Sequence, residues 1–385
     1  MSQSKTDVRE IGVGLIGYQF MGKAHSYGYM TLPLFFVPSI RPVRRVICGR
    51  HEEAVRHAAE QYGWGDYETD WRRVIERDDV DLIDISTPNY LHKEIAVAAA
   101  EAGKIILCEK PLAMDLAEAQ EMMNVVEAAG VKHMIVFNYR FVPAVMLTKK
   151  MIDEGALGRI YHYRAEFLDG WLTDPNAPIQ WRLDAKQAGT GALGDLCAHL
   201  IDLARYLVGE ITSVNGMTET FVHERPIEEG SNEMSPVTVD DTAMFLARFD
   251  NGALGSFEAT RCAGGNYANL NFEINGTDGS VRWRLNDIHR LDYWTRGDEE
   301  SKQGYRTIVT GHVDHPYGTD IWPYRLQLSY GDLFTLQIYE FMKALAEDRD
   351  PSPDFGDGLQ CQAVLEAVAR SVHDGQWVNP QDLLA

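Results

Sequence analysis

The fold is decided near the N-terminus by the stretch Val13-Gly14-Leu15-Ile16-Gly17-Tyr18-Gln19-Phe20-Met21-Gly22. Its first four residues are an apolar run that predicts a buried strand, and a helical pattern follows the turn through Tyr29. In dinucleotide-binding proteins, a G-x-G-x-x-G turn between a strand and a helix lets the backbone approach a pyrophosphate. Here Gln19 replaces the middle glycine, so this turn by itself is weak evidence for such a site.

The same alternation of strand and helix continues through the first third of the chain. Strands are expected at residues 43–48, 80–86, 105–108 and 133–137, and helices at 52–62, 91–102 and 115–129. Strands that alternate with helices predict an α/β fold with a parallel, doubly wound sheet. Right-handed crossovers then bring the carboxyl ends of the strands to one edge, where open sheets of this kind bind ligands.

That edge supplies the candidate cofactor-binding residues. They are Gly17, Gln19, Phe20, Met21, Gly22, Arg50, Ser86, Thr87, Pro88, Asn89, Glu109 and Lys110. In many NAD-binding sheets the second strand ends in an acid that holds the ribose hydroxyls, but here it ends in Cys48-Gly49-Arg50. Arg50 could stack on adenine, pair with a 2′-phosphate, or be a surface residue at a helix start. NAD and NADP therefore both stay open.

A lysine follows the strand at 105–108, in the stretch Leu107-Cys108-Glu109-Lys110-Pro111. At the carboxyl end of a parallel strand its charge could act on a bound substrate. The alternative is a solvated lysine in a loop, because lysine side chains are mostly exposed.

The pattern changes after Asn138. Helices are expected at 143–154, 194–208, 330–346 and 358–373, and strands at 159–167, 211–222, 241–249, 253–260, 269–274, 280–285 and 291–295. Turn signals between these strands, such as Asp250-Asn251-Gly252, predict a large, mainly antiparallel sheet. We expect a dinucleotide-binding domain at 1–138 and a domain for substrate binding and oligomerisation at 139–385. A C-terminal helix packs back on the first domain, and 224–237 forms an exposed loop.

A second group of chemically active side chains lies in the helix expected at 194–208. Asp195 and His199 are four residues apart and share a helical face, with Asp202 near the same face. A carboxylate beside a histidine can orient the imidazole and raise its basicity. The alternative is an ordinary pair on a helix surface.

Aromatic and forked polar side chains in this region suit a sugar pocket. They are Tyr139, Arg140, Trp171, Trp181 and Arg182. Rings offer faces for stacking on a sugar, and guanidinium groups offer several donors for hydroxyls. His312 and His315 are spaced three apart, but we see no further ligands beside them and expect no metal.

Composition excludes several classes of function. The net charge of −21, from 36 basic and 57 acidic side chains, opposes binding to nucleic acid. No apolar run reaches the roughly 18 residues that span a membrane, and the polar first ten residues resemble no signal peptide. Five scattered cysteines without a C-x-x-C pair fit reduced thiols, so we expect a cytoplasmic protein.

Together these motifs resemble the glucose–fructose oxidoreductase/inositol dehydrogenase (Gfo/Idh/MocA) family. The resemblance is carried by the turn at 17–22, Thr87-Pro88-Asn89 with His92, Glu109-Lys110-Pro111, and Gly194-Asp195 with His199, and it runs from about residue 11 to 378. Residues 188–195, 204–210 and 315–318 look like the levoglucosan dehydrogenase branch of that family.

The resemblance implies a Rossmann domain followed by an α/β domain whose open sheet makes dimers or tetramers. It implies NAD as cofactor, with NADP as the alternative, and it adds His92 to the cofactor-binding residues. Lys110 matches the catalytic lysine of the family, and Asp195 and His199 match its catalytic pair. Tyr317 joins Tyr139, Arg140, Trp171, Arg182, Asp195 and His199 as substrate-binding residues.

Three functions remain open at this point. The first is an NAD(P)-dependent dehydrogenase that oxidises a secondary hydroxyl of a hexopyranose or anhydrosugar, and the resemblance points to C3. Here His199 would be the base, and Lys110 would stabilise charge on the reacting oxygen. The second is a glycoside hydrolase that oxidises C3 transiently, eliminates the aglycone, adds water and returns the hydride. The third is a regulator that binds a nucleotide without catalysis.

Overall fold

The computed structural model describes residues 9–323, 326 and 328–384. Expectations for residues 1–8 lie outside this range. The chain divides into two compact units. The first comprises Met1–Ala113, Ala117–Asn138 and Ser329–Gly358, and the second comprises Met114–Leu116, Tyr139–Leu328 and Leu359–Ala385.

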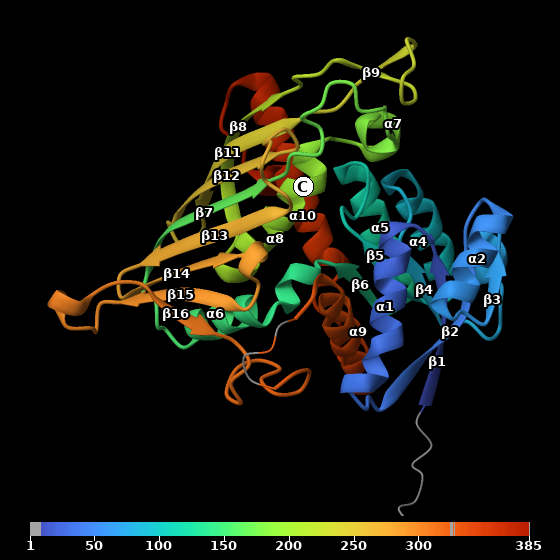
Figure 1. Cartoon of the computed structure of the whole chain (residues 1–385), viewed down its shortest axis with the longest axis horizontal. Helices are drawn as coiled ribbons and strands as arrows, with labels where there is room; N and C mark the ends of the chain where they lie inside the picture. Colours follow the sequence, from blue (N-terminus) through green and yellow to red (C-terminus); the bar gives the residue numbers. More distant parts are fainter. Residues whose placement is uncertain (1–8, 324–325, 327, 385) are drawn as a thin grey trace, which may run out of the picture. The chain divides into compact units, whose positions relative to one another are not determined.

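The first unit contains a six-stranded sheet with the strand order β3-β2-β1-β4-β5-β6, in which every pair is parallel (Figure 1). The strands are β1 Arg9–Ile16, β2 Ile40–Cys48, β3 Asp66–Glu68, β4 Leu82–Ile85, β5 Ile105–Glu109 and β6 His133–Val136. Successive strands run outward from β1 to one side and then from β4 to the other. This confirms the doubly wound parallel sheet, and its strand order reverses between β1 and β4, where such sheets bind dinucleotides.

Four of the five helices that connect these strands were predicted from the helical periodicity of the sequence, although α1 runs to Phe35 and not only to Tyr29. The five helices are α1 Phe20–Phe35, α2 Glu52–Tyr62, α3 Trp71–Ile75, α4 His92–Glu101 and α5 Leu116–Ala129. The short β3 and α3 were not predicted, because so few residues carry no measurable periodicity.

Helix α9 (Tyr330–Ala346) belongs to the first unit although it lies far along the chain, and it packs beside α1 (Figure 1). The Thr31 and Thr335 hydroxyls lie 2.7 Å apart, and the Tyr27 hydroxyl donates to Asp332 at 3.2 Å. These polar contacts, one buried and one partly buried, fix the register between two helices separated by most of the sequence.

The second unit contains an eight-stranded sheet with the order β16-β15-β14-β13-β7-β12-β11-β8. The strands are β7 Ile160–Leu168, β8 Ile211–Glu219, β11 Thr242–Phe249, β12 Leu254–Thr260, β13 Asn269–Gly276, β14 Gly279–Arg284, β15 Arg290–Thr295 and β16 Arg306–Val309. Only β7 and β12 pair in parallel, which confirms a large, mainly antiparallel sheet.

In the central strands of this sheet, alternate residues separate a buried face from an open face. In β11, for example, Ala243, Phe245 and Ala247 are buried, whereas Met244 and Leu246 are exposed. The helices of this unit, seen to one side of the sheet in Figure 1, are α6 Pro143–Asp153, α7 Ala185–Ala188, α8 Ala198–Leu207 and α10 Phe355–Asp374. Short 3₁₀ turns lie at Asn89–Leu91, Asn138–Phe141, Trp181–Leu183, Leu285–Asp287, Glu300–Lys302 and Pro380–Leu383.

Most of the segment 224–237 is exposed, as we predicted, but it is not an irregular loop. It forms a small hairpin of β9 (Glu224–Pro226) and β10 (Met234–Pro236), and the Arg225 side chain is fully buried. The Arg225 guanidinium donates to the carbonyls of Leu172 and Asp174 at 2.8 and 2.7 Å. A buried arginine is tolerated here because backbone carbonyls replace the water that it loses.

The Thr31–Thr335 contact predicts coupled effects on stability. Thr31→Val or Thr335→Val should each lower the free energy of unfolding by about 1–3 kcal/mol, because each leaves the other buried hydroxyl without this partner. The double variant should lose less than the sum of the two, and the coupling is measured by urea unfolding. Thr148→Val removes a buried hydroxyl bond to Ala144 in the other unit and is the control; its loss should add to that of Thr31→Val.

Candidate functional site

The turn between β1 and α1 has no room for side chains at its two glycines. Gly17 has φ +117°, and a Cβ there would lie 2.5 Å from the Ser86 carbonyl oxygen. A Cβ at Gly22 would lie 2.3 Å from the Gly17 oxygen. The turn therefore packs tightly against the end of β4, and it leaves the first amides of α1 without a side-chain cap from Gln19. Such an uncapped helix start suits a pyrophosphate.

The end of β2 explains why no ribose-binding acid stands there. The Tyr18 ring lies so close to Gly49 that a Cβ at position 49 would be 2.0 Å from its Cδ1 atom. An aromatic ring thus fills the space that a side chain at this position would need. Arg50, the next residue, is exposed.

The end of β4 presents both a satisfied hydroxyl and an unsatisfied one. The Ser86 hydroxyl lies 3.3 Å from the carbonyls of Ile16 and Gly17, which ties β4 to the glycine turn. The Thr87 hydroxyl is buried and has no hydrogen-bond partner among the described residues. A buried polar atom of this kind calls for a partner, and a bound dinucleotide could supply it at this edge.

His92 lies behind the turns at this edge and contacts two of them. Its ring nitrogens lie 3.0 Å from the carbonyls of Thr87 and Pro111, and the side chain is fully buried. Burial lowers the pKa of His92, although the contacts with the two carbonyls oppose this shift. The residue joins the turns after β4 and β5, so the structure gives it a supporting position rather than an exposed one.

Glu109 and Lys110 follow β5 with different exposures. The Glu109 side chain is buried, and one of its oxygens accepts a hydrogen bond from the Lys110 backbone N–H at 3.1 Å. Lys110 is half-buried, and its peptide bond to Pro111 is cis. Glu109 therefore shapes the turn that carries Lys110. Of the other residues predicted here, Phe20 is exposed and Met21, Pro88 and Asn89 are half-buried.

Asp195 lies in a π-helical turn, Leu193–Cys197, that precedes α8. The turn is fixed by Asp240, whose carboxylate accepts the backbone N–H groups of Gly191 and Leu193 at 2.7 and 2.8 Å. Burial raises the pKa of Asp240, and these two hydrogen bonds partly offset the rise. The sequence predicted an ordinary helix from residue 194, because a π turn differs from it by one residue and leaves no periodic signal.

Arg261 connects several of the predicted substrate residues. It lies directly after β12, is 1% exposed, and donates to the Asp195 carboxylate at 2.9 Å. It also donates to the Arg182 carbonyl at 3.2 Å, and its guanidinium lies 5.5 Å from the centre of the Trp171 ring. One buried cation thus holds three candidate residues in a fixed arrangement.

His199 lies one turn further along, near the start of α8, and is 8% exposed. The Tyr139 ring meets its imidazole edge-on at 4.6 Å between ring centres, and Phe167 is tilted against it at 6.1 Å. Both rings pack against the imidazole. Arg140 is also buried, and its guanidinium donates to both oxygens of Asp202 at 2.9 and 3.0 Å, which accounts for its position without a substrate.

The remaining candidates lie in two loops. Trp171 packs against a small buried cluster of Leu172, Leu183, Val237 and Val239, and the Arg182 guanidinium stacks 4.5 Å from the Trp181 ring. Tyr317, with φ +54°, lines a small cavity together with Pro143 and His289. His312 and His315 lie with ring centres 5.6 Å apart.

Sequence patterns missed the buried charges. Asp84 stands within the apolar run Leu82-Ile83-Asp84-Ile85, and a carboxylate inside a buried strand signals an unseen partner. His25, Asp240 and Arg261 gave no such signal. Within residues 9–323, 326 and 328–384, no group of three or more metal-binding side chains was found, nor a helix that could span a membrane.

Known proteins resemble the chain over nearly its whole length. Residues 11–137 match the oxidoreductase family with an NAD-binding Rossmann fold, and residues 145–282 match the GFO/IDH/MocA C-terminal domain. Levoglucosan dehydrogenase from Pseudarthrobacter phenanthrenivorans is 43% identical over 391 residues, which cover 98% of this chain and 100% of that protein.

Solved structures agree with this assignment. Levoglucosan dehydrogenase in complex with NADH and levoglucosan has a TM-score of 0.93 at 44% identity, over 96% of this chain and 99% of the other. An oxidoreductase domain protein from Kribbella flavida has a TM-score of 0.93 at 46% identity, with the same coverage. The motifs, the fold and these similarities together establish that the chain belongs to the GFO/IDH/MocA family of oxidoreductases.

Proposed function

We propose that the protein is an NAD-dependent dehydrogenase that oxidises a secondary hydroxyl of a 1,6-anhydrohexose such as levoglucosan, at C3, to the keto sugar. The observation that carries this proposal is the full-length identity of 43% to a levoglucosan dehydrogenase. Further support comes from other relatives named as sugar and inositol dehydrogenases, among them scyllo-inositol 2-dehydrogenase at 32% identity.

NAD suits the residues of the first unit. Two glycines leave no room for side chains at the start of α1, and the Thr87 hydroxyl lacks a partner among the described residues. We assign NAD binding to the residues predicted at this edge, with His92 and Glu109 supporting them from beneath. Arg50 is exposed and no acid stands at the tip of β2, so NADP belongs in the same assay.

The reaction needs a hydride acceptor, a base and a group that stabilises charge on oxygen. Bound NAD⁺ supplies the acceptor for the hydride that leaves the carbinol carbon. We assign the base to His199, whose neutral imidazole takes the hydroxyl proton on a ring nitrogen. Lys110 donates a hydrogen bond to the same oxygen as negative charge develops there. Asp195, held by Arg261, orients the imidazole or accepts a neighbouring hydroxyl.

A panel of substrates tests the function directly. The enzyme is mixed with NAD⁺ or NADP⁺ and with 1,6-anhydrohexoses, free hexoses, inositols and aryl glycosides, and nicotinamide absorbance is followed. Stoichiometric NADH with an anhydrosugar is expected. Release of aglycone with catalytic NAD⁺ and no net reduction would instead establish the hydrolase alternative, which the dehydrogenase names of the relatives do not favour.

Loss of Lys110 or His199 should stop turnover without preventing cofactor binding. Lys110→Ala and His199→Ala should each lower kcat by at least about 10²–10³-fold, because a donor or base that acts only in the transition state is removed. NADH binding, measured by fluorescence, should stay within a few fold. Lys93→Ala, which removes an exposed ion pair with Glu121, is the control and should keep full turnover. Near-normal kcat in both site variants would contradict the assignment.

Arg261 should determine how well the sugar is held. Arg261→Lys keeps the charge but loses the fork that reaches both Asp195 and the Arg182 carbonyl. The KM for sugar should rise about 10-fold or more, because loss of a hydrogen bond to a charged group costs about 1.5–3 kcal/mol. Arg205→Lys, which breaks the paired contacts of Arg205 with Glu210 just beyond the end of α8, is the control. An equal KM in both variants would remove Arg261 from the substrate site.

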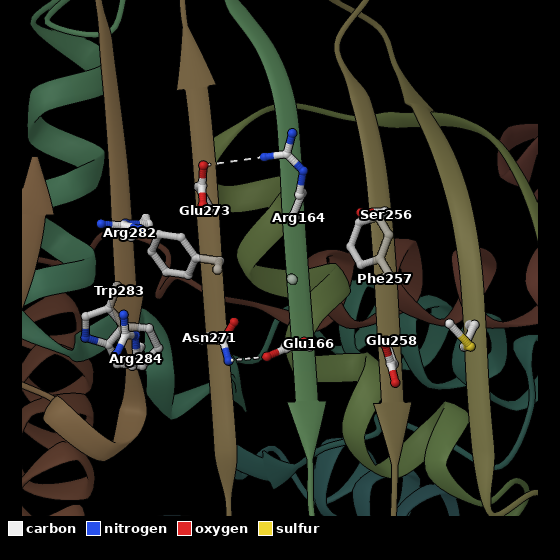
Figure 2. Close-up of a pocket in the computed structure, with 13 residues that line it drawn as sticks. Arg164, Glu166, Ser256, Phe257, Glu258, Asn271, Glu273, Arg282, Trp283 and Arg284 are labelled. Atoms are coloured by element: carbon white, nitrogen blue, oxygen red, sulfur yellow. Dashed lines mark hydrogen bonds and ion pairs between the residues drawn. The ribbon is translucent and has the colours of Figure 1, made fainter. Parts of the chain in front are cut away.

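The open face of the eight-stranded sheet supports a homo-oligomer, either a dimer or a tetramer. Met217 and Met244 are directly opposite on β8 and β11, and Leu246 follows on the same face, so exposed apolar side chains gather on neighbouring strands. Towards β13 the face becomes polar, with Arg164 joined to Glu273 and Asn271 to Glu166 (Figure 2). We propose that a second copy covers this face, because apolar patches of this kind commonly mark interfaces.

Charges placed on that face should separate the copies. The double variant Met244→Asp/Leu246→Asp should shift the protein to a lower mass in light scattering at micromolar concentration, because carboxylates would be buried unpaired at the interface. Val37→Asp alters an apolar side chain that is exposed in the first unit and should leave the mass unchanged. An unchanged mass in the double variant would place the interface elsewhere.

We also propose that the protein works in the cytoplasm. The five cysteines all lie in the described part of the chain, none of them forms a disulfide there, and four of them are buried. Burial raises the pKa of the Cys48 thiol to about 12, so this cysteine is held in its less reactive, protonated form. Cysteines that form no disulfide fit a reducing compartment.

A further inference from the structure

A buried histidine links three elements beneath the edge that carries Lys110. His25, in the second turn of α1, has one ring nitrogen 2.8 Å from Asp84 at the end of β4. Its other ring nitrogen lies 2.9 Å from Glu109 at the end of β5. The Tyr29 hydroxyl donates to Asp84 at 2.9 Å and completes the group. These four residues form the His25 cluster.

Two ionised carboxylates that face the ring are both satisfied when both ring nitrogens of His25 carry protons. A carboxylate accepts hydrogen bonds, and a neutral imidazole has only one N–H to donate. Burial alone would lower the pKa of His25, but the charges of Asp84 and Glu109 and the hydrogen bonds to them outweigh it and raise the pKa to about 10. The stability from this charge is thus fully present below pH 6.5 and is lost as the pH rises through about 10.

The Tyr29 hydroxyl and the titratable side chains next to the cluster stay uncharged. The Phe334 ring of α9 lies against the imidazole, with ring centres 5.2 Å apart. Burial raises the pKa values of the Cys108 thiol and the Tyr29 hydroxyl, and the neighbouring carboxylates add to both shifts. Burial lowers the pKa of His92, which is the other buried histidine near Glu109. His25 is therefore the cation to which the two carboxylates are bound.

The cluster ends at the turn that carries Lys110. One oxygen of Glu109 faces His25, and the other accepts the Lys110 backbone N–H at 3.1 Å. Without His25, the Glu109 carboxylate could rotate away from the Lys110 N–H, because a buried carboxylate is stabilised by a hydrogen bond from any donor within reach. The contact with His25 removes this freedom. The orientation of the Lys110 backbone thus depends on a residue of α1.

We propose that His25 is an imidazolium that acts as a positioning residue for Lys110, by holding the Glu109 carboxylate that accepts the Lys110 N–H. This inference rests on the role assigned to Lys110 in the proposed function. It goes further, because it makes turnover depend on a histidine that need not touch cofactor or sugar.

Two variants within the cluster separate positioning from simple stabilisation. Glu109→Gln keeps an oxygen for His25 but places an amide N–H₂ against the Lys110 N–H, so the bond to Lys110 is lost. Asp84→Asn alters the other side of His25 and leaves the Glu109–Lys110 bond in place. Both should lower the melting temperature. Only Glu109→Gln should lower kcat strongly, by up to about 10²-fold, with the KM for sugar and NADH binding within about twofold.

A third variant keeps the charge of the cluster. Ionised Asp84 and Glu109 with protonated His25 carry one net negative charge, and so does His25→Gln/Glu109→Gln, in which only Asp84 is charged. This double variant should fold and bind NADH, yet it should show the same loss of kcat as Glu109→Gln. Turnover like that of the unaltered protein would overturn the proposal, because neither the cation nor the carboxylate would then be needed.

Two further measurements do not depend on any substrate. In protein labelled with ¹⁵N-histidine, His25 should give an imidazolium signal at pH 8 that is absent in His25→Gln; a neutral ring at this pH would overturn the proposal. In protein labelled with ¹⁵N-lysine, the Lys110 amide should exchange with solvent faster in Glu109→Gln than in Asp84→Asn. Equal exchange and equal kcat in these two variants would reduce the cluster to a structural role. If the unaltered protein oxidised no sugar, the proposed function would fail, while both NMR results would still decide the state of His25.

Discussion

The contact of His25 with Asp84 and Glu109 is the interaction on which the first unit depends most. It joins α1, β4 and β5 at the edge where their ends meet. All three side chains are buried. Loss of one partner would leave another buried without compensation, which costs far more than a surface pair contributes. The glycine turn, the Thr87 turn and the Lys110 turn all lie at this edge and take their positions from the elements that the cluster joins.

A similar principle organises the second unit. Arg261 is a buried cation whose partners are the Asp195 carboxylate and two backbone carbonyls, those of Arg182 and Gly191. Arg225 is buried in the same manner and joins the 169–181 loop to the small hairpin. Because each guanidinium has several donors in a fixed plane, it can hold loops that share no regular structure. The loops with Trp171 and Arg182 gain a defined shape in this way.

The proposed function relies on the residues that these two groups of contacts hold. In the first unit, side chains are excluded from the glycine turn, while the Lys110 turn is fixed from below. In the second unit, an aromatic ring packs against the His199 imidazole, and Arg261 donates a hydrogen bond to the Asp195 carboxylate. A dehydrogenase needs its acid–base groups in one geometry throughout the transfer of a hydride and a proton. Both supports are rigid for the same reason, since a buried charge tolerates little displacement from its partners.

The sequence by itself determined the architecture and the family. Strand and helix periodicity placed β1, β4 and β5, and Glu109-Lys110-Pro111 with Gly194-Asp195 and His199 indicated the chemistry. Only the tertiary structure decided what holds them, because Arg261 meets Asp195 from 66 positions away and His25 meets Glu109 from 84. Periodicity records which face of one element is buried, whereas a partner on another element leaves no local signal. The aromatic ring over Gly49 was hidden for that reason, whereas the π turn at Asp195 and the strands of the hairpin at 224–237 are too short to leave a periodic signal.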